Sequence, residues 1–164
     1  MTLRATILIS VLLFVTDTIG QTRTLRGKVI DQELRPLYGV KIFNSDTTFL
    51  TTSDGDGNFG VIVPWDLKSL IVASVNMEWK SLDISDSCSN LDIILVPSGN
   101  YDFMTAGKVD RLRKKEFDKL PALHKAAFER GLFKSAKLCY VDKFISIKKR
   151  LKEISKSRTQ QPGT

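Results

Sequence analysis

The sequence predicts a mainly β fold: a seven-stranded antiparallel β-sandwich followed by a C-terminal α-helical extension. Three observations lead to this prediction: short apolar runs, turn residues between the runs, and a change to helical spacing from Met104 onward. Many short strands separated by turns are typical of sandwiches and barrels. The strands are expected at residues 25–30, 40–43, 49–52, 59–63, 70–75, 79–84 and 91–96.

Apolar residues alternate along two of these segments, as expected for strands with one face on a core. The alternating residues are Phe59, Val61 and Val63 in one segment and Leu91, Ile93 and Leu95 in the other. Residues 70–75 are almost entirely apolar, which predicts a central strand covered on both faces, one of them by the C-terminal region. Asp-Gly and Gly-Asn pairs at residues 54–58 predict a tight hairpin between the flanking strands.

Short phrases of the β region occur in an order that resembles the carboxypeptidase regulatory-like domain, a transthyretin-like (prealbumin-like) β-sandwich of Gram-negative bacterial envelopes. The matching residues, spread over residues 25–97, are Gly27, Val29, Asp31, Pro36, Leu37, Gly39, Val40, Ile42, Asp54, Gly57, Phe59, Ile93 and Leu95. The sequence departs from the family at residues 76–79, Asn-Met-Glu-Trp, where many relatives have a Gly-Tyr or Gly-Phe pair. The resemblance implies a non-enzymatic module for protein recognition or envelope structure.

Residues 1–20 have the features of a secretory signal peptide: Arg4, an apolar run at residues 7–15, and small residues before Gln21. The apolar run is too short to span a bilayer, since a spanning helix needs about 20 residues. We therefore expect export to the periplasm or cell surface of a Gram-negative bacterium, with an uncleaved anchor as the alternative. The expected domains are a signal peptide (1–20), a β-sandwich (21–98), a basic helical extension (99–155) and a disordered tail (156–164).

Charge is divided unevenly along the chain, because residues 21–103 carry 7 Lys and Arg against 11 Asp and Glu, whereas residues 104–164 carry 17 against 6. Within the basic half, Pro121 predicts a stop or kink near Leu120, and Gly131 predicts a second break.

An apolar stripe follows the second break, with a spacing typical of one helix face. Its residues are Tyr140, Phe144, Ile147, Leu151 and Ile154, and the basic residues around it are Lys143, Lys148, Lys149, Arg150 and Lys152. The stripe is a candidate docking surface for an envelope protein. The basic residues are a candidate site for an anionic polymer or lipid surface, and a solvated helix face is the third interpretation. Export argues against a nucleic-acid partner, and the oligomeric state is left open.

The two cysteines of the chain, Cys88 and Cys139, are candidates for a disulfide in an oxidising compartment. Two unpaired thiols are the alternative, because the spacing in sequence says nothing about the distance in space. Neither cysteine has the neighbouring residues that a thiol nucleophile needs.

No residue pattern predicts catalysis, a cofactor or a metal ion. Asp54, Asp56 and Asn58 alternate as in Ca²⁺ loops, but the twelfth position is Trp65 rather than an acidic residue, so a turn is favoured. His124 is the only histidine and has no second His or Cys at ligand spacing, so a structural role is favoured.

Overall fold

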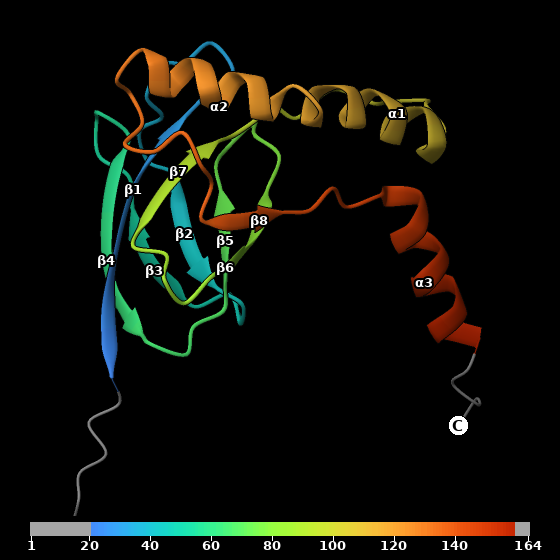
Figure 1. The fold of residues 1–164 in the computed structure, drawn as a ribbon. Coiled ribbons are helices and arrows are strands. Elements are labelled where there is room, and N and C mark those ends of the chain that lie inside the picture. The colour runs from blue at the N-terminus through green and yellow to red at the C-terminus, as the bar shows by residue number, and fades with distance from the viewer. Residues whose placement is uncertain (1–20, 160–164) are drawn as a thin grey trace, which may run out of the picture.

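The computed structural model describes residues 21–159, so the expected signal peptide and residues 160–164 lie outside the described part of the chain. A mainly β fold with a C-terminal helical segment is confirmed (Figure 1). Eight strands are found in residues 21–159, in two sheets, and not the seven that the sequence analysis predicts. The eighth strand lies in the region that was expected to be helical.

The smaller sheet has β1 at its centre and contains one parallel pair, so the fold is not purely antiparallel. Its strands, in order, are β4 (Asn58–Pro64), β1 (Thr22–Ile30) and β7 (Asn90–Ile94), with β1 antiparallel to β4 and parallel to β7. The larger sheet is antiparallel throughout. Its strands, in order, are β3 (Phe49–Thr52), β2 (Lys41–Asn44), β5 (Ser69–Ala73), β6 (Lys80–Ile84) and β8 (Tyr140–Asp142).

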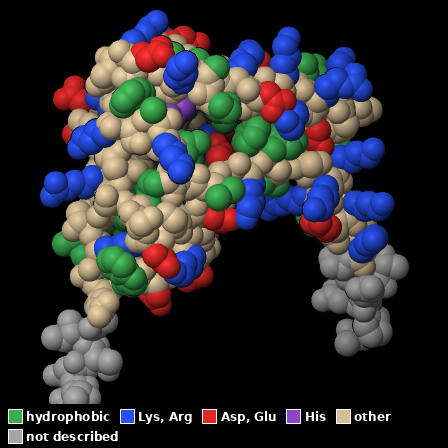
Figure 2. Space-filling view, viewed as in Figure 1, with side chains coloured by type: hydrophobic (Ala, Val, Ile, Leu, Met, Phe, Trp, Pro, Cys, Tyr) green, Lys and Arg blue, Asp and Glu red, His purple; other side chains and the backbone are tan. Residues whose placement is uncertain are grey.

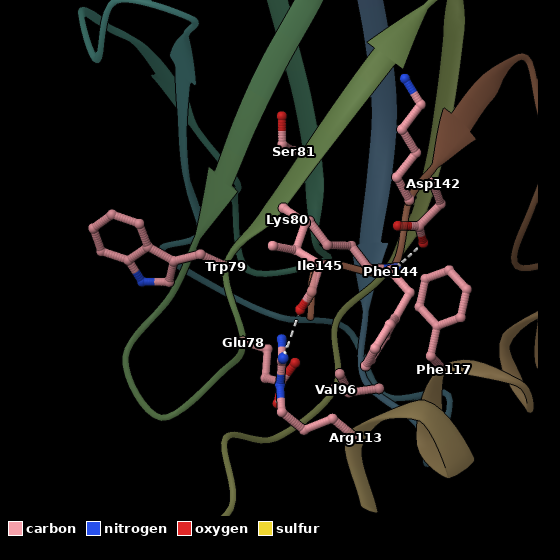
Figure 3. Close-up of a pocket in the computed structure, with 11 residues that line it drawn as sticks. Glu78, Trp79, Lys80, Ser81, Val96, Arg113, Phe117, Asp142, Phe144 and Ile145 are labelled. Carbon is pink, nitrogen blue, oxygen red and sulfur yellow. Dashed lines mark hydrogen bonds and ion pairs between the residues drawn. The ribbon is translucent and has the colours of Figure 1, made fainter. Parts of the chain in front are cut away.

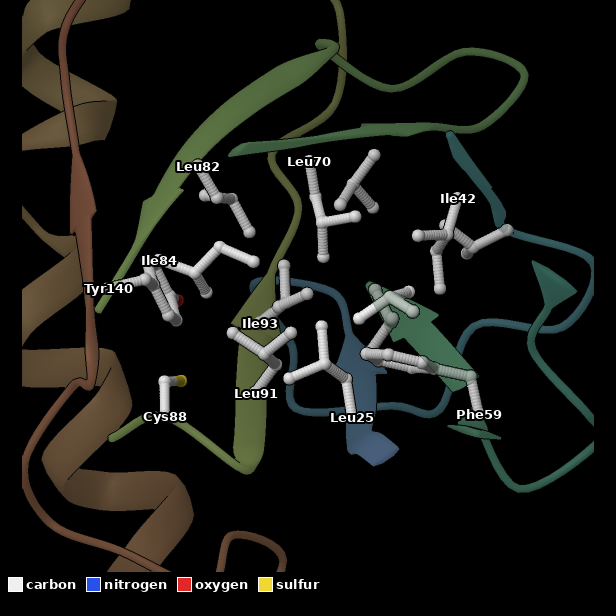
Figure 4. Close-up of a cluster of buried hydrophobic side chains, with 14 of the residues drawn as sticks. Leu25, Ile42, Phe59, Leu70, Leu82, Ile84, Cys88, Leu91, Ile93 and Tyr140 are labelled. Atoms are coloured by element: carbon white, nitrogen blue, oxygen red, sulfur yellow. The ribbon is translucent and has the colours of Figure 1, made fainter. Parts of the chain in front are cut away.

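One hydrophobic core receives side chains from both sheets, as Figure 4 shows. Alternate residues of each strand enter it, because side chains of a strand point to opposite faces in turn. The smaller sheet contributes Leu25, Val29, Phe59, Val63, Leu91 and Ile93, and the larger sheet contributes Ile42, Leu70, Val72, Leu82, Ile84 and Tyr140. Gly27 permits β1 to lie close to its neighbours, since a Cβ atom there would be 2.0 Å from the Leu91 carbonyl oxygen.

The turn at residues 54–58 forms as expected, but it does not close a hairpin. β3 belongs to the larger sheet and β4 to the smaller one, so the turn passes from one sheet to the other. The Asp54 carboxylate accepts hydrogen bonds from the backbone N–H groups of Asp56 (3.0 Å) and Asn58 (2.8 Å), and Gly57 has a φ of +76°. These hydrogen bonds stabilise the turn without pairing the two strands beside it. The strand with which β3 or β4 pairs is therefore determined by the rest of the fold.

Three helices follow the β region: α1 (Ala106–Phe117), α2 (Leu120–Glu129) and α3 (Ile147–Thr159). The break before Pro121 and the end of a helix before Gly131 are confirmed, because α1 stops at Phe117, Pro121 lies in the first turn of α2, and α2 stops at Glu129. A second apolar cluster joins α2 to the outer face of β1 and β7. Its buried members are Ile30, Ile94, Val96, Leu120, Ala127 and Phe133.

The helical cover therefore lies on β7 and not on residues 70–75. β5 is central in its sheet, but Ile71 on its outer face is half-buried, and Val75 beyond its end is 87% exposed. β7 has four buried residues in succession, since its two faces meet different clusters. The prediction that residues 70–75 are covered on both faces is therefore wrong, although their central place in the sheet is confirmed.

The expected helical extension, residues 99–155, contains a strand as well as helices. Residues 140–142 form β8, which pairs with β6 at the edge of the larger sheet. Residues 156–159, expected in a disordered tail, continue α3. Cys88 and Cys139 are bonded in a disulfide just before β8, with Cα atoms 5.3 Å apart.

Candidate docking arm

We use the term arm for residues 143–159, which comprise the segment after β8 and helix α3. Figure 1 shows α3 projecting away from both sheets beneath α1. Helix α3 packs against α1, and the contacts that hold it there are mainly polar. The arm contains nine of the ten residues that the sequence analysis singles out for docking or for anions, Tyr140 being the exception.

Asp110 of α1 holds the beginning of α3. Its carboxylate accepts hydrogen bonds from the Ser146 hydroxyl (2.7 Å) and from the backbone N–H groups of Ile147 (2.8 Å) and Lys148 (3.1 Å). Burial opposes ionisation of this carboxyl, but the three hydrogen bonds and the charge of Arg113 outweigh it, so the pKa of Asp110 lies below its ordinary value. A carboxylate at a helix N-terminus is also favoured by the helix dipole.

Arg113 connects α1 to the segment just before β6 and to the arm (Figure 3). Its guanidinium donates to the Glu78 carboxylate at 2.7 Å and to the Ile145 carbonyl oxygen at 2.8 Å. The hydrogen bond and the negative charge of Glu78 raise the pKa of Arg113 despite burial. Both side chains are largely buried, at 15% and 17% exposed, so the pair is shielded from solvent.

Phe144 lies where α1 meets the arm, at the contact formed with Asp110 and Arg113 that we call the joint, and not on a free surface. Its ring meets the Phe117 ring edge-on, with centroids 5.6 Å apart, and the Arg113 guanidinium carbon is 5.3 Å from the Phe144 ring centroid. A small cavity of about 40 Å³ remains beside these side chains. Phe144 therefore fixes the arm to α1, and the expectation that it contacts a partner protein is not supported by its position.

Tyr140 is also unavailable for docking. It is 8% exposed, it belongs to the core shared by the two sheets, and its hydroxyl donates to the Asp92 carbonyl oxygen at 2.9 Å. Burial raises the pKa of this phenol. The expected five-residue stripe is therefore wrong as a single helix face, because pairing with β6 draws its first residue into the core.

The remaining three stripe residues lie on α3. Ile147 is half-buried against the joint, whereas Leu151 is 55% exposed and Ile154 is 41% exposed. The predicted basic residues of α3 are all exposed, namely Lys148, Lys149, Arg150 and Lys152. Lys143 lies before α3 and forms an exposed ion pair with Asp83 of β6.

A groove with a volume of about 520 Å³ is formed by residues of the arm. Its lining residues are Lys143, Phe144, Ile145, Ser146, Lys149, Arg150 and Glu153. Figure 2 shows the surface hollowed beneath α1 and many Lys and Arg side chains on the arm. The groove combines three basic side chains with the 47%-exposed Ile145, so it offers charge and apolar surface together.

The other candidate residues have structural positions. His124 is buried on α2 at 4% exposed, its ring centroid is 4.9 Å from that of Phe133, and burial lowers its pKa. Asp54 holds the turn described above. No group of three or more His, Cys, Asp or Glu residues in the described part of the chain is arranged to hold a metal ion. Within residues 21–159, no helix is long and apolar enough to cross a membrane.

Sequence analysis missed the residues that position the arm. Asp110, Arg113 and Glu78 come from two distant segments and share no motif. Ser146 had a local signal, since a serine before a helical run is a favoured N-cap, and its hydroxyl accepts from the Lys149 N–H at 3.1 Å. That signal would have placed the start of α3 at Ile147 rather than at Tyr140.

Comparison with known proteins adds little. No protein-family model matches the chain, and no curated protein matches it. A crystal structure of 3-chlorocatechol 1,2-dioxygenase from Rhodococcus opacus 1CP is similar over 51% of this chain, with 14% sequence identity and a TM-score of 0.35. The chain spans 62% of the length of that dioxygenase chain. A likeness at this TM-score carries no argument about function, so the arm has to be interpreted from its own geometry.

Proposed function

We propose that this protein is an exported, non-enzymatic recognition module that binds an acidic protein surface with its arm. In this proposal the β region is a prealbumin-like sandwich of the carboxypeptidase regulatory-like type, which serves as the scaffold. The observation that carries the proposal is the basic groove along the arm, together with the exposed Leu151 on α3.

Charge complementarity selects the partner. Helix α3 has six Lys and Arg among its 13 residues and a single Glu, so an acidic surface is attracted and a basic one is repelled. Burying the exposed part of Leu151 against the partner would add apolar contact beside the basic side chains of α3, and interfaces commonly combine an apolar core with a polar rim.

The concave shape of the groove favours a protein partner over a flat bilayer. Lys143 and Lys149 both line this hollow of about 520 Å³, which admits a protruding loop or extended segment more readily than a planar lipid surface. An anionic lipid or polymer remains the second candidate function, because a basic helix with an apolar stripe is also typical of helices that lie on membranes.

The test compares three variants of the full chain for capture of envelope proteins, followed by affinity measurement with the purified captured protein. Leu151→Glu and the pair Lys149→Glu with Arg150→Glu are each expected to weaken binding at least tenfold, which corresponds to about 1.4 kcal/mol. Ile62→Glu is the matched control, since Ile62 is a 70%-exposed apolar residue on β4, far from the arm in sequence. Equal loss in all three variants would contradict docking through the arm.

Vesicles with and without an anionic lipid distinguish the second candidate. Binding to anionic vesicles that disappears at high salt, with no acidic protein captured, would favour the lipid interpretation, because interactions between exposed charges are screened by salt. Binding to a protein that depends on Leu151 and survives moderate salt supports the first proposal.

A further inference from the structure

Lys80 and Asp142 form a buried pair of opposite charge between the adjacent strands β6 and β8. The Lys80 Nζ atom is 2.5 Å from Asp142 Oδ2, and the two side chains are only 8% and 12% exposed. The Lys143–Asp83 pair joins the same region of the sheet but is exposed, at 67% and 47%. Two pairs of the same chemical type therefore lie close together in the chain with opposite access to water.

The buried pair lies between two small cavities, and apolar side chains line part of each, although Glu78, Ser81 and Arg113 also line the first. The apolar side chains include Phe117, Phe144 and Val96 in the first cavity and Ile94, Leu120 and Leu138 in the second. Burial lowers the pKa of Lys80, although the hydrogen bond with Asp142 and the negative charges of Asp142 and Glu78 act in the opposite direction. In such an environment, transfer of a proton from the ammonium to the carboxylate removes two buried charges and leaves a neutral amine beside a neutral carboxylic acid.

His124 supplies an additional proton-accepting atom at the same place. It lines the small cavity together with Lys80, Asp142 and Tyr140. Its Nε2 atom is buried without a hydrogen-bond partner in the described part of the chain, and the ring has a hydrogen bond with the backbone of Ala136. The other ring nitrogen therefore carries the proton, and Nε2 is free to accept one.

We propose that Lys80 and Asp142 condense to form an intramolecular amide, with His124 Nε2 accepting a proton from the Lys80 nitrogen and returning it to the carboxyl oxygen that leaves Asp142. The bond that forms joins Lys80 Nζ to Asp142 Cγ, and the bond that breaks joins Cγ to one carboxyl oxygen, which leaves as water. Of the three ammonium hydrogens, one stays on the amide and two leave in that water, so no oxidant, reductant or further reactant is needed. The cavity of about 10 Å³ is close to the smallest volume that holds one water molecule.

Such a crosslink has a clear structural role, which is independent of the proposed docking function. β8 is only three residues long, yet it connects the body to the arm. The disulfide at Cys139 fastens the chain immediately before β8, and the amide at Asp142 fastens the last residue of β8. The two bonds together make the base of the arm a covalent part of the larger sheet.

Mass spectrometry of the purified full-chain protein, after reduction of the disulfide, tests the proposal without any variant. We expect the protein to be lighter than its sequence by the mass of one water, once its N-terminal residue has been identified. Digestion should release the segment containing Lys80 linked to the segment containing Asp142. The full sequence mass would overturn the proposal, and so would a water loss located elsewhere, for example as a succinimide at Asp54-Gly55 or Asp56-Gly57.

Three variants define the reacting groups. Lys80→Met should have the full mass, whereas Lys143→Met, the matched control from the exposed pair, should keep the linked peptide. His124→Phe should form the linked peptide about a hundredfold more slowly after synthesis, the scale of a lost proton-transfer group. Linkage at an unchanged rate in His124→Phe would remove His124 from the reaction.

Discussion

The two-sheet body and the arm are held by different kinds of interaction. The body buries a continuous set of aliphatic side chains, many of them with no exposed surface at all. The arm is attached through the carboxylate of Asp110, the guanidinium of Arg113 and the ring of Phe144. Apolar burial is distributed over many residues and is hard to reverse locally, whereas a joint of a few polar contacts can open while the body remains folded.

The comparison predicts the largest loss of stability when a buried side chain of the body is shortened. Leu91→Ala removes a fully buried side chain between the sheets and should lower the free energy of unfolding by about 2–5 kcal/mol. Urea unfolding followed by tryptophan fluorescence measures this difference. Val75→Ala, at an 87%-exposed apolar position, is the control and should change stability by no more than about 0.5 kcal/mol. Similar losses in both variants would mean that burial does not distinguish the two positions.

The disulfide is the next largest contribution, because it ties the base of the arm to the body. Cys88 and Cys139 are separated by 51 positions, and closing a loop of this length stabilises a protein by about 4 kcal/mol in the chain-entropy model. Reduction should shift urea unfolding of the native protein but not of the Cys88→Ala, Cys139→Ala double variant. An amide between Lys80 and Asp142 would restrict much of the same loop, so a markedly smaller shift would agree with that crosslink.

The strands of the body were largely predictable because each is indicated by residues within its own short segment of sequence. Alternation such as Phe59, Val61 and Val63, with turn residues on either side, is sufficient to identify a strand and its buried face. The sheet to which each strand belongs was not predictable in the same way. The turn at residues 54–58 has the composition of a hairpin turn, yet the strands on its two sides pair with β2 and β1.

The arm was predicted poorly because its structure depends on distant residues. Tyr140 and Phe144 have helical spacing, but β8 forms through pairing with β6, about 60 positions earlier in the chain. A pairing of this kind overrides the local pattern, since strand formation depends on the neighbouring strand. The joint likewise brings together Glu78 and Arg113, which are 35 positions apart, and no spacing rule connects them.

Loss of the Arg113 side-chain contacts should release the arm without unfolding the body. Arg113→Met keeps an apolar stem against Phe144 but removes the hydrogen bonds to Glu78 and Ile145. Hydrogen bonds to charged groups contribute about 1.5–3 kcal/mol each, so exchange of α3 amide hydrogens should accelerate at least tenfold. Amides of β7 should exchange at nearly the native rate. Lys114→Met is the control, because it removes one positive charge at the neighbouring exposed position. Faster exchange of the α3 amides in this control would contradict the role given to Arg113.

The smallest expected effect is a change of arm attachment with pH, which originates at Asp110. Its folded pKa is depressed below the ordinary value of about 3.9, so its ionised form is favoured by the folded arm. The contribution is therefore complete above about pH 4 and is lost as the pH falls through the lower folded pKa. The backbone N–H resonances of Ile147 and Lys148 should shift in this acid range, and Asp110→Asn should abolish the shift. Asp86→Asn is the control, because Lys68 depresses the pKa of Asp86 at an exposed site away from the arm. A shift that persists in Asp110→Asn would place the titrating group outside the joint.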